Sequence, residues 1–418
     1  MEKGFTEEVF LAIMTEGRDR PRLSENQTLL SPVVLVGPPR LSFKKPVVLS
    51  FGHCANLKLG SWELGVYHCD SLFSDADDTP WVKLVTIGQE SVSTPILASM
   101  DFDKCFIMTD FLTRFCIVGQ SGLEGNASKV LRLLIFGKVI SSSLDFSLCV
   151  QVIDDTPSAL ERVLTTAKKQ GFGLMDKPKT LYFQDGGSDL HLTIGECTTG
   201  WSMKPKTLQK LSFHEIWSST SSSPTSNFGT TPNLRINYSL QHIDPTVSLI
   251  AFKLSAFQFG HPETCQSFSV NVDSSNGTCF LPFPTSYESL SSRGGSLLSS
   301  NGGGGSAGGG SAGGGQIFCH PETTCKLPPS LKKRLCQMLD NPQTMGQNDW
   351  RALAAGLRME RFTQFFESRD SPTEGILTLW EVQKGEDPGS ITDLLNLLRV
   401  IGRMDCATMI ESEYGPWI

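Results

Sequence analysis

The sequence predicts a multidomain protein in which two all-β, sandwich-like domains are followed by an all-α bundle of six short helices. Three observations predict this arrangement. The 418 residues exceed the size at which a single hydrophobic core keeps growing. Short runs of β-branched and aromatic residues, bounded by Gly, Pro, Asn or Asp, recur up to about residue 285. Beyond a glycine-rich tract, the apolar residues recur instead at spacings of three and four.

The first β domain is predicted at residues 1–121. Apolar and aromatic runs that end at turn-forming residues are typical of strands in antiparallel sheets. The expected strands lie in EEVFLAIM, SPVVLVGPP, KPVVLSFG, WELGVYHC, WVKLVTIG and CFIMTDFLTRFCIVGQ.

The second β domain is predicted at residues 126–285, and its boundary with the first lies near the turn-rich stretch GQSGLEGNAS. One segment, TPSALERVLTTAKKQGF, breaks the strand pattern, because Leu160, Val163, Leu164 and Ala167 follow Thr156 and Pro157 at helical spacing. We therefore expect one helix inside a second sandwich. The expected strands lie in KVLRLLIFGKV, DFSLCVQVIDD, KTLYFQDG, LHLTIGE, FHEIWSST, NLRINYSLQ, VSLIAFKLSAFQF and SFSVNVD.

A linker is predicted at residues 286–325, and it contains the tract NGGGGSAGGGSAGGGQ. Glycine has no Cβ and adopts both signs of φ, so such a tract behaves as a random coil. It is expected to tether the two halves of the chain without orienting them.

The helical bundle is predicted at residues 326–418, with helices in PPSLKKRLCQMLD, NDWRALAAGLRM, MERFTQFFES, SPTEGILTLWEVQK, SITDLLNLLRVIGRM and CATMIESEY. The fourth helix begins with a capping box, in which Ser371 precedes Glu374 by three residues and Pro372 takes the first helical position. The apolar stripes of these helices predict a common core. Its expected members include Trp350, Leu353, Trp380, Leu394 and Leu398.

Charge and cysteine usage limit the classes of function. A formal net charge of −7 and a pI near 5.6 argue against nucleic-acid binding. The sequence has no apolar run of about eighteen residues, and MEKGFTEEVF lacks the pattern of a signal peptide. The 12 cysteines are scattered singly, mostly within apolar segments, as reduced core thiols are. We expect the chain to be soluble and cytoplasmic.

The bundle resembles a death domain, through the pairing of NDWRALAAGL with DSPTEGILTLWEVQ. The β half resembles the cytoplasmic region of the Unc-5 netrin receptors. ENQTLLSPVVLVGPP, KPVVLSFGHCA and FCIVGQS are similar to the ZU5 domain of that family, and LRLLIFGKVISSSLDFSLCVQVIDDTPSALERVL with KPKTLYFQ and FHEIWS is similar to its UPA domain. The resemblance covers nearly the whole chain outside the glycine-rich region. It begins only near Thr6, so the ZU5 domain is expected to be truncated at its N-terminus.

The resemblance implies a non-catalytic signalling module on the cytoplasmic side of the plasma membrane, as part of a full-length receptor. Such a module transmits axon-guidance, cell-migration or apoptotic signals. The implied partners are death-domain or adaptor proteins, an intramolecular contact between the ZU5/UPA half and the death domain, and netrin only through an extracellular part that this chain lacks. The alternative is an ankyrin-like or soluble ZU5/death-domain scaffold without a netrin-receptor role.

Several residue patterns contain the residue types of chemical sites. His53-Cys54 and His68-Cys69 contain zinc-binding residue types, but adjacent residues in a strand point to opposite faces. Some ZU5 domains cleave themselves at His-Phe-Ser, whereas this chain has the reverse order at residues 212–214. The acidic run at residues 75–78 matches a protease-recognition pattern, yet a solvated turn is the simpler interpretation. No phosphate-binding loop or nucleophile motif occurs. We therefore expect no enzyme activity, cofactor or metal.

Charged residues of the bundle form the candidate interaction surface. The sequence places basic and acidic residues on different helices, and such a domain can associate head to tail with another copy. From charge alone a solvated mixed surface is the simpler interpretation, and the death-domain resemblance favours association. The candidate residues are Lys332, Lys333, Arg334, Arg351, Arg358, Arg361, Glu374, Glu381 and Asp393.

Overall fold

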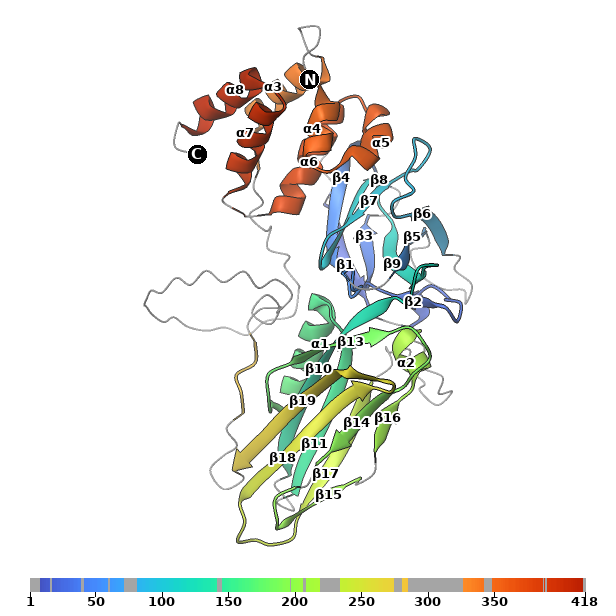
Figure 1. Cartoon of the computed structure of the whole chain (residues 1–418), viewed down its shortest axis with the longest axis vertical. Coiled ribbons are helices and arrows are strands. Elements are labelled where there is room, and N and C mark those ends of the chain that lie inside the picture. Colours follow the sequence, from blue (N-terminus) through green and yellow to red (C-terminus); the bar gives the residue numbers. More distant parts are fainter. Residues whose placement is uncertain are drawn as a thin grey trace. The chain divides into compact units, whose positions relative to one another are not determined.

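The computed structural model divides the chain into two compact units (Figure 1). The first unit contains Met1–Glu90 and Thr94–Leu290, and the second contains Ser291–Ile418 with Ser91–Ser93. The predicted linker lies outside the described residues. The structure describes residues 8–15, 17–38, 41–58, 61–70, 81–140, 145–195, 197–205, 208–218, 234–273, 280–284, 326–341, 348–385, 387 and 389–415.

The N-terminal half of the first unit contains two antiparallel sheets. The larger sheet has the order β1-β3-β9-β5-β6, with β2 beside β9. Its strands are β1 (Phe10–Met14), β2 (Gln27–Leu29), β3 (Val33–Gly37), β5 (Trp62–Cys69), β6 (Val82–Thr86) and β9 (Arg114–Ser121). The smaller sheet has the order β4-β8-β7, with strands β4 (Ser42–Gly52), β7 (Leu97–Met100) and β8 (Lys104–Phe111).

These two sheets share one apolar core. Val34, Val66 and Ile117 from the larger sheet pack with Ala98 and Ile107 from the smaller one, and all five are buried. Burial of side chains from both sheets in one cluster is the arrangement of a β-sandwich. The expected sandwich architecture of this region is therefore present, with β2 and β7 as strands that the sequence patterns did not reveal.

The C-terminal half of the first unit is a second pair of antiparallel sheets. One has the order β12-β10-β11-β17-β15, with β13 also beside β10, and its strands are β10 (Ser128–Ile140), β11 (Asp145–Asp154), β12 (Gly173–Leu174), β13 (Lys179–Gln184), β15 (Trp201–Lys204) and β17 (Arg235–His242). The other has the order β16-β14-β18-β19, with strands β14 (Leu190–Ile194), β16 (Gln209–Leu211), β18 (Leu249–Gln258) and β19 (His261–Asp273).

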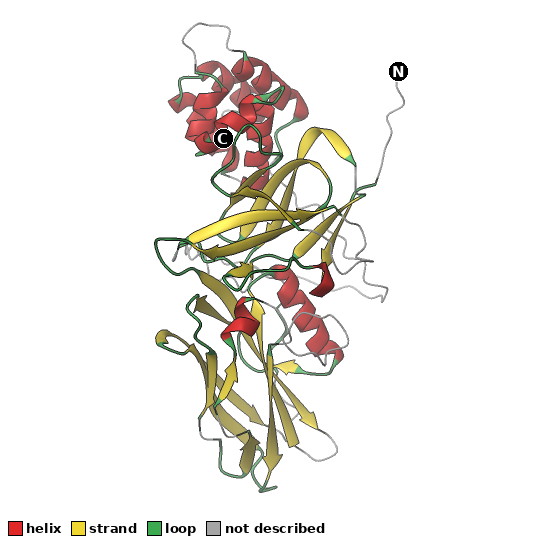
Figure 2. Ribbon diagram, turned by 90° about the vertical axis from the view of Figure 1, so that its right-hand side faces the viewer, coloured by secondary structure: helices red, strands yellow, loops and turns green. Residues whose placement is uncertain are grey.

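Strand alternation builds the core between these sheets. Leu133 and Leu148 from the first sheet pack with Leu192 and Leu254 from the second. Along β18 buried residues alternate with residues that are more exposed, as period-two geometry requires of a sheet with one covered face. The outer face of the first sheet is covered in part by helix α1 (Pro157–Lys169), which appears in red beside the yellow strands in Figure 2.

Helix α1 confirms the expected helix between the strands. Thr156 caps its N-terminus by accepting a hydrogen bond from the backbone N–H of Ala159, and Pro157 takes the first position. Leu160, Val163 and Ala167 are buried against the sheet. Leu164, the fourth residue of the predicted stripe, is half-buried beside them, so the sequence spacing predicted the face that packs on the sheet.

The segment FHEIWSST, expected to be a strand, instead contains helix α2 (Phe213–Trp217). Ser212 accepts a hydrogen bond from the backbone N–H of Glu215, and the carboxylate of Glu215 accepts one from the backbone N–H of Ser212. This reciprocal capping box stabilises a single helical turn despite the aromatic and β-branched residues within it. The strand prediction was wrong, and the Ser-x-x-Glu spacing was the signal that it overlooked.

The second unit is helical. The described part of it contains six α-helices and one 3₁₀ turn, where six helices were expected. The segment MERFTQFFES forms both the turn and a short helix. The elements are α3 (Pro329–Asp340), α4 (Trp350–Gly356), the 3₁₀ turn η3 (Glu360–Phe362), α5 (Thr363–Glu367), α6 (Pro372–Lys384), α7 (Ser390–Val400) and α8 (Met404–Tyr414).

One side of each main helix faces a common interior. Trp350 and Leu353 of α4, Trp380 of α6, and Leu394 and Leu398 of α7 are all buried. Helix α6 begins as its sequence indicates, because the hydroxyl of Ser371 accepts a hydrogen bond from the backbone N–H of Glu374.

A buried arginine joins three parts of the helical unit. The Arg403 guanidinium donates hydrogen bonds to the backbone oxygens of Met338 and Asn348 and to both carboxylate oxygens of Asp405. Its side chain is 1% exposed. Arg403 therefore ties the start of α8 to the end of α3 and to the residues that precede α4.

Candidate protein-interaction surfaces

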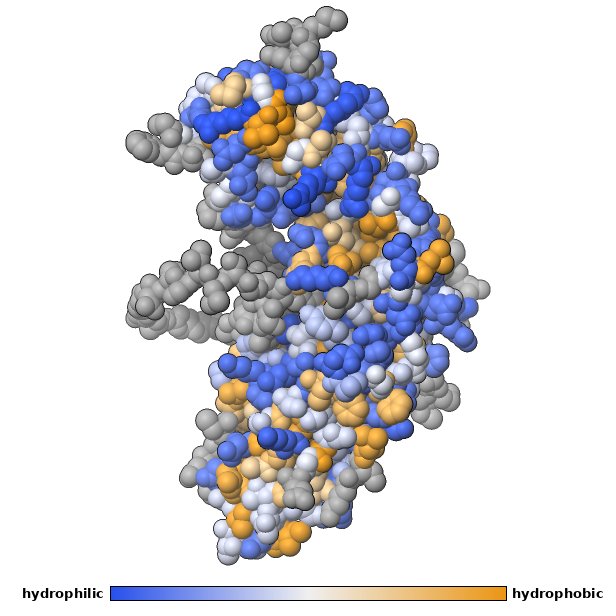
Figure 3. Space-filling model, in the orientation of Figure 1, coloured by the Kyte–Doolittle hydropathy of each residue, from blue (hydrophilic) through white to orange (hydrophobic). Residues whose placement is uncertain are grey.

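The candidate basic residues of the helical unit differ in their surroundings. Lys333 and Arg334 on α3, and Arg358 after α4, are exposed and form no ion pair with the described residues. Arg361 is exposed and its guanidinium lies over the ring of Phe362, with 4.3 Å to the centroid. These side chains present positive charge to solvent, on a unit whose visible face in Figure 3 is largely hydrophilic.

Two of the candidate residues are bound to each other inside the unit. The Lys332 Nζ lies 2.7 Å from the Glu381 carboxylate and donates a second hydrogen bond to Thr378. Glu381 is buried, and it also accepts a hydrogen bond from the backbone N–H of Leu327. The pair joins α3, α6 and the residue that precedes α3. Its position indicates a structural role in the bundle.

Further candidate charges are paired at the surface. Arg351 binds the carboxylates of Asp349, at 2.8 Å, and Glu367, at 2.5 Å, and these contacts raise the pKa of its guanidinium. Asp393 lies 3.4 Å from Lys384. Arg351 and Glu367 lie on different helices, as do Lys384 and Asp393, and the fold brings these opposite charges together. Asp349, by contrast, is the N-cap of α4, the helix that contains Arg351. Glu374 is half-buried in the first turn of α6.

A buried junction lies inside the first unit, where its two sandwiches meet. Helix α2 packs beside β2, and the indole of Trp217 stacks on that of Trp62 in β5, with 5.9 Å between the centroids and 4° between the planes. Trp217 also stacks on Phe213, which in turn stacks on Phe183 in β13. A continuous row of aromatic rings therefore runs from the first sandwich into the core of the second.

Polar contacts surround this aromatic row. The Thr28 hydroxyl donates a hydrogen bond to the backbone oxygen of Trp217. The fully buried Nζ of Lys129 donates to the backbone oxygen of Ile216 at 3.3 Å and forms an ion pair with Asp154 at 2.8 Å. Both bonds hold the C-terminal end of α2, and the bond from Thr28 joins the first sandwich to this helix of the second. No local sequence pattern indicates this junction.

Backbone hydrogen bonds reinforce the same junction. The N–H of Cys54 donates to the backbone oxygen of Leu30, the N–H of Val130 donates to that of Cys54, and the N–H of Asp155 donates to that of Val130. These bonds run from the first sandwich through the start of β10 to the segment that precedes α1. Together with the side-chain contacts, they leave little freedom for the sandwiches to move independently.

The histidines of the His-Cys pairs contact oxygen atoms of the protein. His53 Nε2 lies 2.8 Å from the backbone oxygen of Asp101, and His68 Nδ1 lies 3.3 Å from the Asp70 carboxylate. Within the described ranges, no three His, Cys, Asp or Glu side chains are grouped as metal ligands would be. The acidic run at residues 75–78 lies outside those ranges.

Comparison with protein families agrees with this geometry. A model of the ZU5 domain matches residues 1–70, a model of the UPA domain matches residues 127–275, and a model of the death domain matches residues 332–414. The chain therefore contains ZU5, UPA and death domains in that order, which is the architecture typical of Unc-5-like and ankyrin-like proteins.

These domains are protein-interaction modules rather than catalytic families, and the death domain implies binding to other death-domain or adaptor proteins. Among the described helices, none combines the length and the apolar character that crossing a bilayer requires.

Proposed function

We propose that this chain is the non-catalytic intracellular signalling module of a netrin receptor, which transmits guidance, migration or apoptotic signals through its death domain and its ZU5/UPA body. The observation that carries the proposal is the order of the three domain matches along one chain. The Unc-5-like segments described above support the receptor assignment over other proteins with the same modules. In this proposal the ZU5 domain spans residues 1–121, the UPA domain 126–285 and the death domain 326–418.

The proposed interaction surface of the death domain is the exposed positive charge of Lys333, Arg334, Arg358 and Arg361. Exposed charge of one sign orients an approaching partner and accelerates association. The complementary partner surface is acidic, as on another death domain or an adaptor. The proposed location is the cytoplasmic face of the plasma membrane, and an extracellular part of the receptor would bind netrin on the opposite side.

We also propose that the death domain docks reversibly on the ZU5/UPA body. The glycine-rich sequence between them predicts a flexible tether, which holds two modules at an effective concentration that reaches the millimolar range. At that concentration a weak contact is populated and still releasable. Small-angle X-ray scattering of the chain, beside a version with a shortened tether, tests the docking. A compact particle in both cases is expected, and an extended particle with independent halves would contradict it.

A receptor chimera tests the netrin role. Residues 1–418 would be joined to the membrane span and extracellular region of a netrin-binding receptor. The chimera would be expressed in cells that have no netrin receptor of their own. The expected result is a netrin-dependent change in migration or survival, which disappears when residues 326–418 are removed. A chimera that reaches the surface and binds netrin without either response would refute the receptor function.

The alternative function is a scaffold of the ankyrin type. The interlocked ZU5/UPA body favours it, because a rigid body of two sandwiches offers a broad surface for a partner. Capture experiments with the whole chain and with the chain lacking residues 326–418 distinguish the two functions. A receptor module loses its death-domain and adaptor partners on this deletion, whereas a scaffold retains its main partners.

A further inference from the structure

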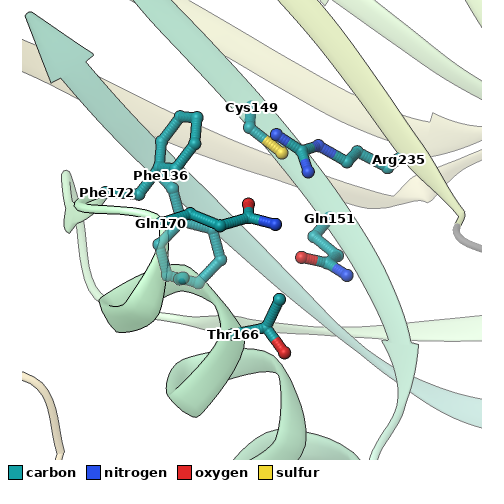
Figure 4. Close-up of a pocket in the computed structure, with 8 residues that line it drawn as sticks. Phe136, Cys149, Gln151, Thr166, Gln170, Phe172 and Arg235 are labelled. Carbon is teal, nitrogen blue, oxygen red and sulfur yellow. The ribbon is translucent and has the colours of Figure 1, made fainter.

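A small pocket lies on the outer face of the UPA region, between the C-terminal end of α1 and the sheet beneath it (Figure 4). Its volume is about 70 Å³. The lining residues come from β10, β11, β17, α1 and the turn that follows α1. They are Phe136, Cys149, Gln151, Thr166, Ala167, Gln170, Phe172 and Arg235.

Strand register explains why the polar residues converge. Gln151 of β11 and Arg235 of β17 are directly opposite each other in the antiparallel pair, so their side chains leave the sheet on the same face. Gln170 reaches over the same space from the end of α1, and Figure 4 shows its amide and the Arg235 guanidinium directed toward one another. Neither glutamine amide has a hydrogen-bond partner among the described residues.

The charge around the pocket is positive. Arg235 donates from Nε to the side-chain oxygen of Asn237 at 2.8 Å, and its guanidinium lies 5.4 Å from the centroid of Phe172. In the described part of the chain it has no carboxylate partner. Lys138 donates to the backbone oxygen of Gln170 at 2.8 Å, and this contact offsets the partial negative charge at the C-terminus of α1.

The cysteine in the wall adds no negative charge. Burial raises the pKa of the Cys149 thiol to about 11, although the adjacent guanidinium of Arg235 acts in the opposite direction. The thiol therefore stays neutral at physiological pH. The opposite wall is apolar and consists of Phe136, Phe172 and Ala167.

We propose that this pocket binds the carboxylate of an acidic ligand, with Arg235 as its charged anchor. A guanidinium matches the geometry of a carboxylate, and two free amides can donate to the same oxygens. The aliphatic stem of the acid would lie against Phe136 and Phe172. The volume accommodates a carboxylate group and is too small for a nucleotide or a sugar. Because Thr166 and Gln170 are exposed, the carboxylate enters from solvent at the end of α1. The site is independent of the receptor function proposed above.

Methyl NMR of the full chain tests the site, because Thr166 and Ala167 line it and both carry methyl groups. With alanine and threonine methyls labelled, glutarate is the acidic probe and glutaramide its uncharged control. We expect saturable shifts of these two methyls with glutarate and none with glutaramide, while Ala354 in the helical unit stays unchanged. Equal responses to both probes, or no saturable shift with glutarate, would overturn the proposal. So would tighter binding of inorganic phosphate, because the site would then select a different anion.

Variants separate binding from folding. Arg235→Gln is expected to weaken glutarate binding by about tenfold or more, since it removes a charged hydrogen-bond donor. Gln170→Ala, at an exposed position, is expected to weaken it about two- to tenfold. Lys253→Gln, which removes an exposed positive charge from β18, should leave binding unchanged. An otherwise unaltered methyl spectrum shows that each variant is folded. Retention of full affinity by Arg235→Gln would refute the assignment.

A peptide arm identifies the source of the carboxylate. A short blocked peptide with a central glutamate is titrated beside its glutamine counterpart. If the glutamate peptide binds at least about tenfold more tightly than glutarate, the site is built for an acidic side chain of a protein partner. If glutarate binds as tightly or more tightly, the site takes a small organic acid. If the two peptides bind equally, the peptide contact does not use the carboxylate, and a protein source is excluded.

Discussion

The indoles of Trp62 and Trp217 stack in parallel at the meeting point of the two sandwiches, with 5.9 Å between their centroids. Trp62 belongs to the larger sheet of the N-terminal sandwich, whereas Trp217 ends the short helix α2 of the second one. Trp217 is fully buried. The contact fixes the ZU5 and UPA regions relative to each other. A partner that binds one of them therefore binds a surface whose position the other stabilises.

Removal of the Trp217 indole should destabilise the first unit strongly. Trp217→Ala is expected to lower the free energy of unfolding by about 3–5 kcal/mol, because it leaves a cavity and breaks the aromatic row. Urea unfolding followed by circular dichroism measures this loss. Tyr182→Ala is the control, since Tyr182 is an aromatic residue 40% exposed on β13.

A double-mutant cycle of Trp62→Ala and Trp217→Ala should give a coupling energy of about 0.5–1.5 kcal/mol between the two rings. Strictly additive losses would show that the stacked pair does not contribute to the junction.

The buried ion pair of Arg132 and Asp155 should respond asymmetrically to substitution. Both side chains are 1% exposed, and the guanidinium donates to both carboxylate oxygens, at 2.9 and 3.0 Å. Asp155→Ala leaves a buried, uncompensated guanidinium and should cost about 3–5 kcal/mol of unfolding free energy. The double variant Arg132→Met/Asp155→Leu should recover most of that loss, because it removes both charges. If the double variant were as unstable as the single one, the loss of unfolding free energy would come from altered packing and not from the uncompensated charge.

Charge reversal on α3 should reduce partner binding by the death domain without lowering its stability. The double variant Lys333→Glu/Arg334→Glu is expected to change stability by no more than about 0.5 kcal/mol, since both side chains are exposed, and to reduce capture of death-domain partners. Thermal unfolding and pull-down measure the two effects. Full capture by this variant would remove the α3 charges from the proposed surface.

Glu381→Gln is expected to lower the stability of the helical unit and to leave partner capture unchanged, which is the reverse of the result expected for the α3 variant. The substitution removes the charge that compensates Lys332, whose side chain is only 17% exposed. We expect a loss of about 1–3 kcal/mol of stability in the helical unit. The exposed basic residues are unchanged, so partner capture at a temperature where the unit is folded should remain. Loss of capture without loss of stability would place Glu381 in the interaction surface.

The helical unit should lose stability in acid through Asp405. Hydrogen bonds from Arg403 hold the pKa of this carboxyl below its usual value of 3.8. In the unfolded chain the carboxyl gains a proton first, so the contribution is complete above pH 3.8 and declines as the pH falls through the lower folded value. Hydrogen exchange of the α8 amides at neutral and acidic pH should show this loss. Asp405→Asn should show a smaller change between the two conditions, and an equal change in both proteins would contradict the assignment.

The buried thiols predict that the protein also loses stability at alkaline pH. Burial raises the pKa of Cys149 to about 11 and that of Cys406 to about 12. Both thiols ionise near pH 9.0 once unfolded, so their contribution to stability is complete below that pH and declines as the pH rises toward the folded values. Alkylation by iodoacetamide at pH 8 should therefore modify the exposed Cys265 and spare Cys149 and Cys406 until the chain unfolds. Equal rates at all three would show that the buried thiols are accessible.

Local patterns predicted much of the secondary structure. The alternation in VSLIAFKLSAFQF marked β18, and the spacing behind Thr156 marked α1 together with its buried face. The segment of α2 was misassigned, because Phe213, Ile216 and Trp217 favour strands and only the Ser212–Glu215 capping box indicates a helix. Short strands such as β15 and β16 contain too few residues for a period to be recognised.

The candidate interaction surface was less predictable than the core. Apolar spacing indicated that Trp350 and Trp380 lie on inward stripes, and both are buried. A charged side chain gives no such signal, since Lys332 and Lys333 are neighbours in sequence but only Lys332 meets a buried carboxylate. The Arg235 pocket could not be predicted from the sequence either, because its hydrogen-bond donors come from separate strands and from the end of a helix.

The sequence by itself determined the order of an all-β half and an all-α half, because strand and helix periods are local properties that a few consecutive residues express. The tertiary structure alone decided which distant residues meet. It placed Trp62 against Trp217, paired Lys332 with Glu381, and directed Gln170 and Arg235 into one pocket. Such contacts depend on how sheets and helices pack over long separations in the chain, and no local pattern encodes them.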